Sequence, residues 1–366
     1  MLIFLQFFLQ SGVVLFFREF SESPEKLIKN GRPLFGTYSG NISKLDIKGV
    51  KKPFGIIPVP PVFTNIAIRS HLILSFNAGD YIGQVCFFDA KLFGYAEFVY
   101  WNKNTNLKYA YNTFTGPRKR LVPKNLQRGI AVSFKKARYL RISWDRQKNR
   151  FSLLVNMKGD SLRPDTRAHF SCTAQEMTDL VTVMPAPTSR RCSATLVSFF
   201  PLRGALSTVK SPEIKAMEQT DGMALMTINR SYYKLHARFN TLTATGMHNG
   251  KKIALFLATS SIDSKDTNKC NPNTLFLNGE MTLLPQVFVT HPFGMDKIWN
   301  IQDTENMVDL TFSPVSENLR KMNTVIFRTI YHTIYGTFEG TLLTKDGESI
   351  SVKNLSGIIQ TTMLRL

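Results

Sequence analysis

The strongest constraint on the fold of this chain is a set of tight-turn dipeptides between stretches of alternating apolar and polar residues. Asn249-Gly250, Asn278-Gly279 and Asp346-Gly347 each separate two such stretches. Both central residues of a type I′ turn need a positive φ, which asparagine, aspartate and glycine adopt most readily. An alternation with a period of two gives a strand one buried side. These three positions therefore predict antiparallel β-hairpins.

Longer turns and the aromatic content extend this prediction to most of the chain. Asn102–Asn106 and Asp145–Asn149 each separate two strand-like runs, and the 366 residues include 28 Phe and 11 Tyr, which suit a half-buried pleated surface. The best candidate helix is the short stretch 211–218, where Ser211 can cap the N-terminus. Many short strands without intervening helices predict an all-β fold, built as an antiparallel sandwich or barrel.

The length of the chain suits two domains of ordinary size. The alternating pattern breaks at MPAPTSRRC, residues 184–192, where proline, serine and arginine cluster. We therefore expect two β-domains, at residues 31–185 and 190–366, after a separate N-terminal segment at residues 1–30.

The N-terminal residues 1–17, MLIFLQFFLQSGVVLFF, are apolar except for two glutamines, a serine and a glycine. A membrane span needs about 20 apolar residues, so this run is short for one. A secretory signal would carry a basic start and a small-residue cleavage site, and neither precedes Arg18. A peripheral membrane anchor, an atypical signal and a first pair of strands all stay open.

A seven-residue phrase occurs near both ends of the chain, as LFGTYSG at residues 34–40 and as IYGTFEG at residues 334–340. Glycine weakens the interior of a strand unless another backbone approaches closely or the strand bends. We therefore expect close contacts or barrel bends at Gly36, Gly40, Gly336 and Gly340. The two phrases mark either two equivalent strands or two strands that bring the chain termini together.

The formal net charge of +20 is unevenly distributed. Residues 102–150 contain fourteen Lys and Arg but one acidic residue, Asp145, so this stretch alone carries +13. Such a field attracts anionic partners, which include a membrane surface, an anionic ligand and nucleic acid. Nucleic-acid binding is disfavoured because no recognised nucleic-acid module contains these residues. A solvated basic face on β-hairpins explains the pattern without any partner.

The cysteine and histidine content disfavours several classes of site. Four widely spaced cysteines without a C-x-x-C pair, together with only six histidines, argue against a zinc module or a disulfide framework. The sequence has no G-x-S-x-G, H-E-x-x-H or phosphate-loop pattern, which disfavours nucleophilic hydrolase chemistry. We expect reduced thiols, no metal, no cofactor and a cytoplasmic location, with a periplasmic location as the alternative and membrane association through residues 1–17 left open.

Several phrases, in their order, resemble a known family. PNTLFLNGEMTLLPQVFV, WNIQDTENMVDLTFSP and YGTFEGTLLTKDGESISVKNLSG are similar to motifs of an uncharacterised, mainly bacterial family, domain of unknown function number twenty-eight hundred and four. The strand pair around Asp89 and Gly94 is similar as well, so the resemblance covers most of residues 30–366. The residues that answer the C-terminal pattern are Asn273, Trp299, Ile301, Asp303, Asp309, Leu310, Phe312, Pro314, Gly336, Phe338 and Gly340.

The family is in turn distantly similar to the calycin-like double barrels, which include carotenoid hydratases and tocopherol cyclase. This resemblance implies two antiparallel, lipocalin-like β-barrels or sandwiches packed together, few short helices, and an apolar ligand at their interface. The chain departs from the family at Pro272, where an acidic residue is usual, and at Phe239, where a Trp-rich strand is expected. If the polar constellation of the family is catalytic, these departures imply that it is altered or lost here.

Hydration, cyclisation or isomerisation of a polyene in such a cavity needs an acid, and burial must raise the pKa of that acid. Asp89, in the apolar context CFFDAKLF, is the first candidate, and Glu339 in the repeated phrase is the second. The structural alternative for Asp89 is a hydrogen-bonded aspartate at the end of a strand.

The stretch NRSYYKLHARFN adds further candidates, namely Tyr233, His236, Arg238 and Asn240. Alternate residues of a strand share a face, so His236, Arg238 and Asn240 are expected to line up. Facing a cavity they would bind a carboxylate or a hydroxyl, with His236 as a catalytic candidate, and facing water they would be a wet surface. Asn273 and Trp299 complete the candidate ligand-binding residues, although Trp299 also suits a core position.

These observations favour a double-barrel protein that binds an apolar small molecule, lipid or isoprenoid, with or without redox-neutral hydratase, cyclase or isomerase activity. The alternative is a non-enzymatic membrane-surface or envelope-associated protein that uses its basic face and apolar N-terminus. Whether any reaction is catalysed, and the oligomeric state, stay open.

Overall fold

The computed structural model describes residues 18–40, 42–55, 59–91, 93–116, 121–208, 219–232, 236–260, 266–323 and 328–365. The apolar segment 1–17, the predicted helix at 211–218 and the candidate residue Tyr233 lie outside the described residues. The structure is 65% strand and 3% helix, which confirms the all-β prediction. Its described α-helix, α2 (Pro61–Ile66), has six residues, and no helix in the described ranges has the length and apolar content needed to cross a membrane.

The larger of two main sheets has twelve strands, and every pair within it is antiparallel. Its path runs in the order β7-β6-β5-β4-β14-β13-β11-β10-β9-β8, and β12 pairs with both β13 and β3. The strands are β3 (Gly36–Ser39), β4 (Ile68–Ala78), β5 (Tyr81–Asp89), β6 (Gly94–Asn102), β7 (Lys108–Thr115), β8 (Arg128–Lys135), β9 (Arg138–Asp145), β10 (Arg150–Met157), β11 (Thr166–Cys172), β12 (Thr178–Pro185), β13 (Cys192–Ser207) and β14 (Thr220–Tyr232). Outside it, β1 (Ile28–Lys29) pairs with β2 (Arg32–Pro33), and η1 (Ala174–Glu176) is a short 3₁₀-helix.

This sheet curls until its two end strands, β7 and β8, come together. Lys135 Nζ donates a hydrogen bond to Phe114 O at 2.9 Å, and Arg138 donates one to Asn112 O at 3.5 Å. The inside of the curl holds one large apolar core, where the ring of Phe76 packs against Phe98 and Phe170. The result is a nearly closed barrel.

The second sheet has nine antiparallel strands in the order β18-β17-β16-β15-β23-β22-β21-β20-β19. It forms a half-barrel with its own core, in which Leu255, Trp299, Phe312 and Phe338 are fully buried. Its strands are β15 (His236–His248), β16 (Lys251–Ser260), β17 (Thr274–Leu277), β18 (Glu280–Leu283), β19 (Phe288–Thr290), β20 (Trp299–Gln302), β21 (Val308–Asn323), β22 (Arg328–Leu343) and β23 (Ser349–Arg365).

All the predicted hairpin turns are confirmed. The turns at 249–250, 278–279 and 346–347 join β15 to β16, β17 to β18 and β22 to β23. The longer turns at 102–106 and 145–149 join β6 to β7 and β9 to β10. Asn249 and Gly250 both have positive φ, at 48° and 75°, as a type I′ turn requires.

The chain changes from the first sheet to the second between Tyr232 and His236. The first sheet therefore extends beyond the boundary that the sequence predicts at 184–192. That segment is the turn between β12 and β13, within one sheet, and Ala186 N donates to Arg191 O across it at 3.1 Å. Its prolines interrupt strand pairing, which ends a hairpin as readily as it ends a domain.

The repeated phrase occurs in two strands of different length, one in each sheet. LFGTYSG contains β3, a four-residue strand that pairs with β12 and forms one isolated bridge, between Tyr38 and Ser21. IYGTFEG lies inside the sixteen-residue β22, between β21 and β23. A Cβ at Gly336 would lie 2.2 Å from Ser313 O, so this glycine does mark a close backbone approach. At Gly40 a Cβ would meet nothing within 4 Å, and this glycine supplies a turn with φ of 74° instead.

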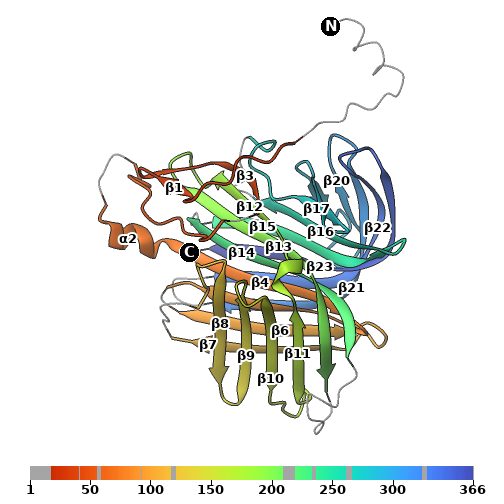
Figure 1. The fold of residues 1–366 in the computed structure, drawn as a ribbon. Helices are drawn as coiled ribbons and strands as arrows, with labels where there is room; N and C mark the ends of the chain where they lie inside the picture. Colours follow the sequence, from red (N-terminus) through yellow and green to blue (C-terminus); the bar gives the residue numbers. More distant parts are fainter. Residues whose placement is uncertain are drawn as a thin grey trace, which may run out of the picture.

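The two sheets pack face to face (Figure 1), and strands β4, β5 and β14 of the first contact β15 and β23 of the second. Apolar side chains from both sheets fill most of the interface, including Phe199 against Phe276 and Trp101 against Tyr335. Hydrogen bonds also cross it, from Asn77 Nδ2 to Thr245 O at 2.8 Å and between Thr243 Oγ1 and Ser75 Oγ at 3.2 Å. The candidate site lies in this interface.

Candidate functional site

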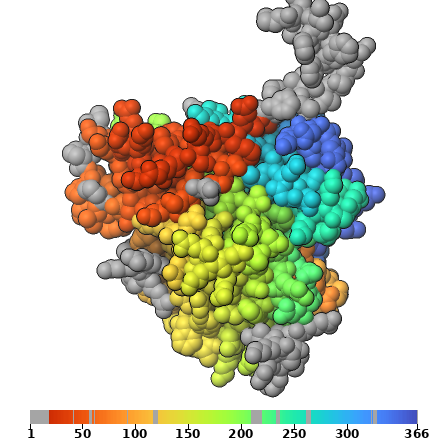
Figure 2. Space-filling model, in the orientation of Figure 1, coloured from red at the N-terminus to blue at the C-terminus, as the bar shows by residue number. Residues whose placement is uncertain are grey.

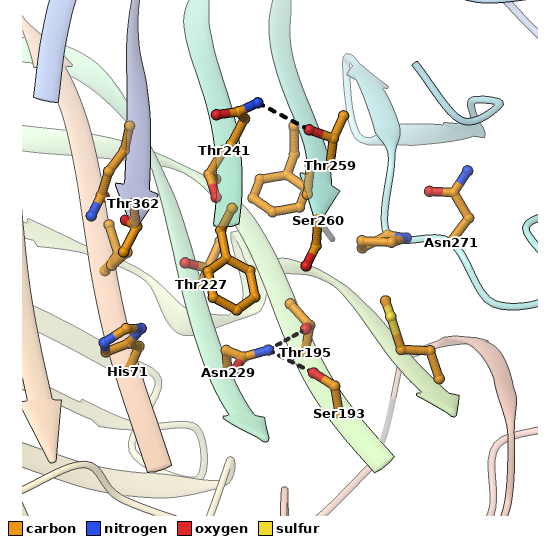
Figure 3. A pocket seen from close by; sticks show the side chains of 18 of the residues that line it. His71, Ser193, Thr195, Thr227, Asn229, Thr241, Thr259, Ser260, Asn271 and Thr362 are labelled. Carbon is orange, nitrogen blue, oxygen red and sulfur yellow. Dashed lines mark hydrogen bonds between the residues drawn. The ribbon is translucent and has the colours of Figure 1, made fainter. Parts of the chain in front are cut away.

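A cavity of about 130 Å³ lies between the two sheets, where β4, β13 and β14 face β15, β16 and β23 (Figure 3). The loop at 267–272 closes one side of it. Partly exposed residues such as Asn240, Ser260 and Gln286 mark the side on which the cavity reaches solvent. Strands of both sheets form it, and the lining residues range from His71 on β4 to Thr362 on β23.

Strand register explains which side chains reach the cavity. Thr195, Asn229 and His71 are direct partners across β13, β14 and β4. On the opposite sheet, Ala258, Thr241 and Gln360 are direct partners across β16, β15 and β23. Cross-strand partners share one face of a sheet, and here these faces are the two that pack together. Each wall is therefore a row of residues that strand pairing aligns, and the packing of the sheets brings the two rows together.

A hydrogen-bonded network of neutral groups forms the wall on the first sheet. Asn229 Nδ2 donates to Ser193 Oγ at 3.0 Å and to Thr195 Oγ1 at 2.8 Å, as the dashed lines in Figure 3 show. Asn229 Oδ1 accepts a hydrogen bond from Ser231 Oγ at 2.7 Å. On the other wall Asn240 Nδ2 donates to Thr259 Oγ1 at 3.2 Å. These bonds fix the orientation of hydroxyl and amide groups around the cavity.

The lining combines these polar groups with apolar surface and carries no net charge. Ile73, Met184, Phe239 and Phe256 supply the apolar walls. Among the described lining residues there is no Asp, Glu, Lys or Arg, and the titratable ones are His71 and Cys270. Burial, aided by the positive charge of Arg320, lowers the pKa of His71 to about 3. The imidazole is therefore neutral at pH 7.

Gln360, on the second wall, has an unsatisfied hydrogen-bond acceptor. The residue is 6% exposed, and its Oε1 atom is buried with no hydrogen-bond partner among the described residues. A buried carbonyl without a donor costs about 1–3 kcal/mol. Gln360 lines the cavity, so a donor group of a bound molecule is a natural partner for this oxygen.

A buried ion pair lies beside the cavity. Arg320, on β21, is a direct partner of Tyr331, which is a direct partner of the cavity residue Thr362. The guanidinium donates to the carboxylate of Glu97 on the other sheet and to Tyr95 Oη, and it lies 4.0 Å from the centre of the Tyr331 ring. This fixed positive charge is close enough to His71 to help hold the imidazole neutral.

The residues predicted from sequence are distributed over several environments. Asn240 lines the cavity. Asn273 is fully buried behind the lining, where Oδ1 accepts from Ala258 N and Nδ2 donates to Pro285 O, both at 2.8 Å. Trp299 is a fully buried core residue whose Nε1 donates to Met295 O at 3.1 Å. Pro272 and Phe239, the two departures from the family pattern, both line the cavity.

The candidate acids lie elsewhere. Asp89 is buried at the end of β5, where its carboxylate accepts from Lys91 N at 2.9 Å and contacts Lys91 Nζ at 2.5 Å. Glu339 is exposed on β22. His236 and Arg238 do share a face as expected, but they line a separate surface hollow with Arg328 and Arg365. The structure does not bring Asp89, His236 and Glu339 together.

His71, Asn229 and Gln360 are cavity residues that the sequence reasoning did not single out. Each is a polar residue inside a long strand, next to a buried apolar residue, which is Leu72, Ile228 or Ile359 respectively. That signal is present in the sequence, but it does not say which polar positions meet across the interface.

The four cysteines form no disulfide, and Cys86, Cys192 and Cys270 are buried. Of the four, Cys270 lines the cavity. Burial raises the pKa of Cys86 and of Cys192 to about 12, so neither is a thiolate at neutral pH. In the part of the chain that the structure describes, no three His, Cys, Asp or Glu side chains are grouped as metal ligands would be.

The fold and cavity define a two-sheet antiparallel β-protein with a neutral pocket between the sheets. The chain belongs to the family described as Domain of unknown function (DUF2804), whose family model matches residues 67–365. No curated protein matches the sequence. Among solved structures the chain is similar to kievitone hydratase from Nectria haematococca, with 10% identity, 81% of this chain and 88% of that chain covered, and a TM-score of 0.39. At that distance the likeness carries no argument about function.

Proposed function

We propose that this protein binds a small, uncharged molecule in the cavity between its two sheets. The bound part of the ligand is about the size of a single ring and carries at least one hydroxyl or N–H group. The observation that carries this proposal is the buried acceptor Gln360 Oε1, which has no partner among the described residues and belongs to a cavity of neutral polar groups.

The volume of the cavity limits the size of the ligand. An apolar cavity of about 150 Å³ takes up benzene, and this cavity measures about 130 Å³. A ring with one small substituent therefore suits it. A longer lipid or isoprenoid would place one end in the cavity and extend past Asn240 and Ser260, on the side that reaches solvent.

The charge of the lining limits the charge of the ligand. An ion that enters a buried site loses its hydration and needs an opposite charge there. The described lining residues include no charged side chain, and His71 is neutral at pH 7. A neutral ligand can use the apolar walls of Ile73, Phe239 and Phe256 while it hydrogen-bonds to Gln360 or to the hydroxyl groups.

The uncharged lining favours ligand binding over acid catalysis. Hydration or cyclisation of an alkene needs a proton donor in contact with the substrate. Neutral His71 is a poor acid for that step, and Asp89 and Glu339 are not among the lining residues. A hydratase, cyclase or isomerase activity stays a prediction that would need an acid from another source, such as the ligand itself or a residue outside the described ranges.

Native mass spectrometry of the full chain, purified without organic solvent, tests the proposal. We expect a bound neutral molecule that is released when the protein is unfolded. Thr227→Phe, at a lining residue of β14, should fill the cavity and abolish co-purification.

Thr311→Phe, at an exposed position of β21, is the matched control and should retain the molecule. Retention by Thr227→Phe, or a bound molecule that carries a formal charge, would rule out the proposed site.

A further inference from the structure

The outer face of β8, β9 and β10 combines apolar and cationic side chains. Inward residues of these strands, such as Ala131, Ile142 and Leu153, fill the barrel core. The alternate residues point outward, and register places them in rows, with Phe134 beside Tyr139 and Val132 beside Arg141 and Leu154. Figure 2 shows this stretch, in yellow, on the side of the molecule turned to the viewer.

The apolar side chains of this face include exposed ones. Ile130 is 48% exposed and Phe134 is 60% exposed, although both lie inside a regular strand. Phe114, on the adjacent end strand β7, is also exposed, so the apolar surface continues across the barrel closure. Exposed apolar patches bounded by polar groups commonly mark interaction sites.

The same face is strongly positive. Residues 128–157 contain eight Lys and Arg and one acid, Asp145. Three of these cations form ion pairs, Arg128 with Asp145, Arg138 with Asp160 and Arg146 with Asp179. The others have no such pair among the described residues, and they include Lys135 and Lys136, next to Phe134. The apolar side chains are therefore surrounded by an excess of positive charge.

We infer that this face docks on a lipid bilayer that contains anionic lipids. Cationic side chains are attracted to anionic headgroups by about 1 kcal/mol each, and neighbouring apolar side chains can enter the interface. The charge argues against a second copy of the chain, because two such faces would repel each other. Phe134 and Tyr139 are aromatic, as in the platforms of single-strand binders, whereas base readers use polar groups. The aliphatic side chains of Ile130 and Val132 serve neither purpose, so they favour a bilayer over nucleic acid.

Co-sedimentation of the full chain with vesicles tests this inference. The two vesicle types are phosphatidylcholine alone and phosphatidylcholine with about a third phosphatidylserine, at low salt. We expect binding to the anionic vesicles only. Lys135→Gln with Lys136→Gln should weaken that binding roughly thirtyfold, at about 1 kcal/mol for each cation. Ile130→Ser with Phe134→Ser should weaken it at least tenfold.

Two matched control variants separate this face from other parts of the surface. Lys251→Gln with Lys252→Gln, on β16 of the second sheet, and Phe293→Ser, an exposed apolar site there, should leave binding unchanged. A local readout is the rate at which an amine-acylating reagent modifies each lysine. Anionic vesicles should slow the modification of Lys135 and Lys136 at least fivefold but not that of Lys252.

Three results would overturn the inference. The first is equal binding of the protein to neutral and anionic vesicles. The second is vesicle binding that the substitutions at residues 130, 134, 135 and 136 leave unchanged. The third is acylation of Lys135 and Lys136 at a rate that vesicles do not slow. Binding to a double-stranded DNA probe in preference to anionic vesicles would overturn it as well. Because the test does not involve the cavity, its failure would leave the proposed ligand site untouched.

Discussion

Arg320 of β21 reaches across the interface between the sheets and donates to the carboxylate of Glu97 on β6. Both side chains are almost fully buried, at 9% and 4% exposed. Glu97 also accepts from Tyr95 Oη at 3.1 Å, and Asn318 Nδ2 lies 3.4 Å from the same carboxylate. The pair therefore joins the two sheets and stabilises a positive charge beside the candidate cavity.

The first prediction concerns this ion pair. Glu97→Gln removes the negative charge and leaves the Arg320 guanidinium buried without a counterion. Breaking a buried pair in this way costs about 3–5 kcal/mol, and we expect a loss of that size in the free energy of unfolding measured with urea. Lys124→Ala is the control, because its pair with Asp46 is about a third exposed and should contribute less than about 1 kcal/mol. Equal losses of unfolding free energy in the two variants would mean that the buried pair stabilises the fold no more than the exposed pair does.

The second prediction concerns the pH dependence of stability. The ordinary pKa of His71 is 6.5 and burial lowers it to about 3 in the folded protein. Between these values the unfolded chain binds a proton that the folded chain does not, so stability is full above about pH 6.5 and falls as the pH falls towards 3. From pH 7 to pH 5 His71 alone should remove about 2 kcal/mol of unfolding free energy.

His71→Gln keeps a polar group of similar size but cannot titrate, so it separates this contribution from those of the carboxylates. Urea unfolding at pH 7 and pH 5 should show a smaller loss in the variant, by about 2 kcal/mol. If wild type and variant lose the same stability, the folded imidazole titrates normally, and the cavity is not the neutral environment described above.

The third prediction concerns the repeated glycine phrase. A Cβ at Gly336 would lie 2.2 Å from Ser313 O and 2.6 Å from the Phe312 ring. Gly336→Ala should therefore lower the unfolding free energy by the ~1–3 kcal/mol typical of overpacking. Gly116→Ala, where a Cβ meets nothing within 4 Å and φ is not in the left-handed region, should have little effect. An unchanged melting temperature for Gly336→Ala would show that β21 and β22 can accommodate the added Cβ without a loss of stability.

Local turn chemistry made the fold largely predictable from the sequence. Pairs such as Asn249-Gly250 specify a hairpin by themselves, because the required backbone conformation depends on those two residues and on few others. The boundary between sheets was less predictable. The proline-rich segment at 184–192 interrupts pairing in the same way whether the chain then stays in its sheet or leaves it.

The candidate site was less predictable than the fold, because it depends on how two sheets stack. Asn240 was singled out for its place in an alternating row, and it does line the cavity. His71 and Gln360 lie almost three hundred positions apart and line the same cavity only because the two sheets pack together. Asp89 resembles a buried acid in sequence, whereas in the structure Lys91, two residues away, pairs with it.

The most direct test of the proposed ligand site compares three ring-sized probes, phenol, toluene and benzoate. Toluene has a methyl group in place of the hydroxyl group of phenol, and benzoate carries a charged carboxylate. Calorimetric or NMR titration of the full chain at pH 7 should give the order phenol, then toluene, with no binding of benzoate in the cavity.

Gln360→Leu removes the acceptor and should weaken phenol binding by about 1 kcal/mol, or roughly fivefold, while toluene binding is retained. Gln302→Leu, at an exposed site on β20, should change neither affinity. We expect this loss of affinity for phenol alone. Phenol binding that is unaffected by Gln360→Leu, or benzoate binding as tight as that of phenol, would contradict the proposed ligand site.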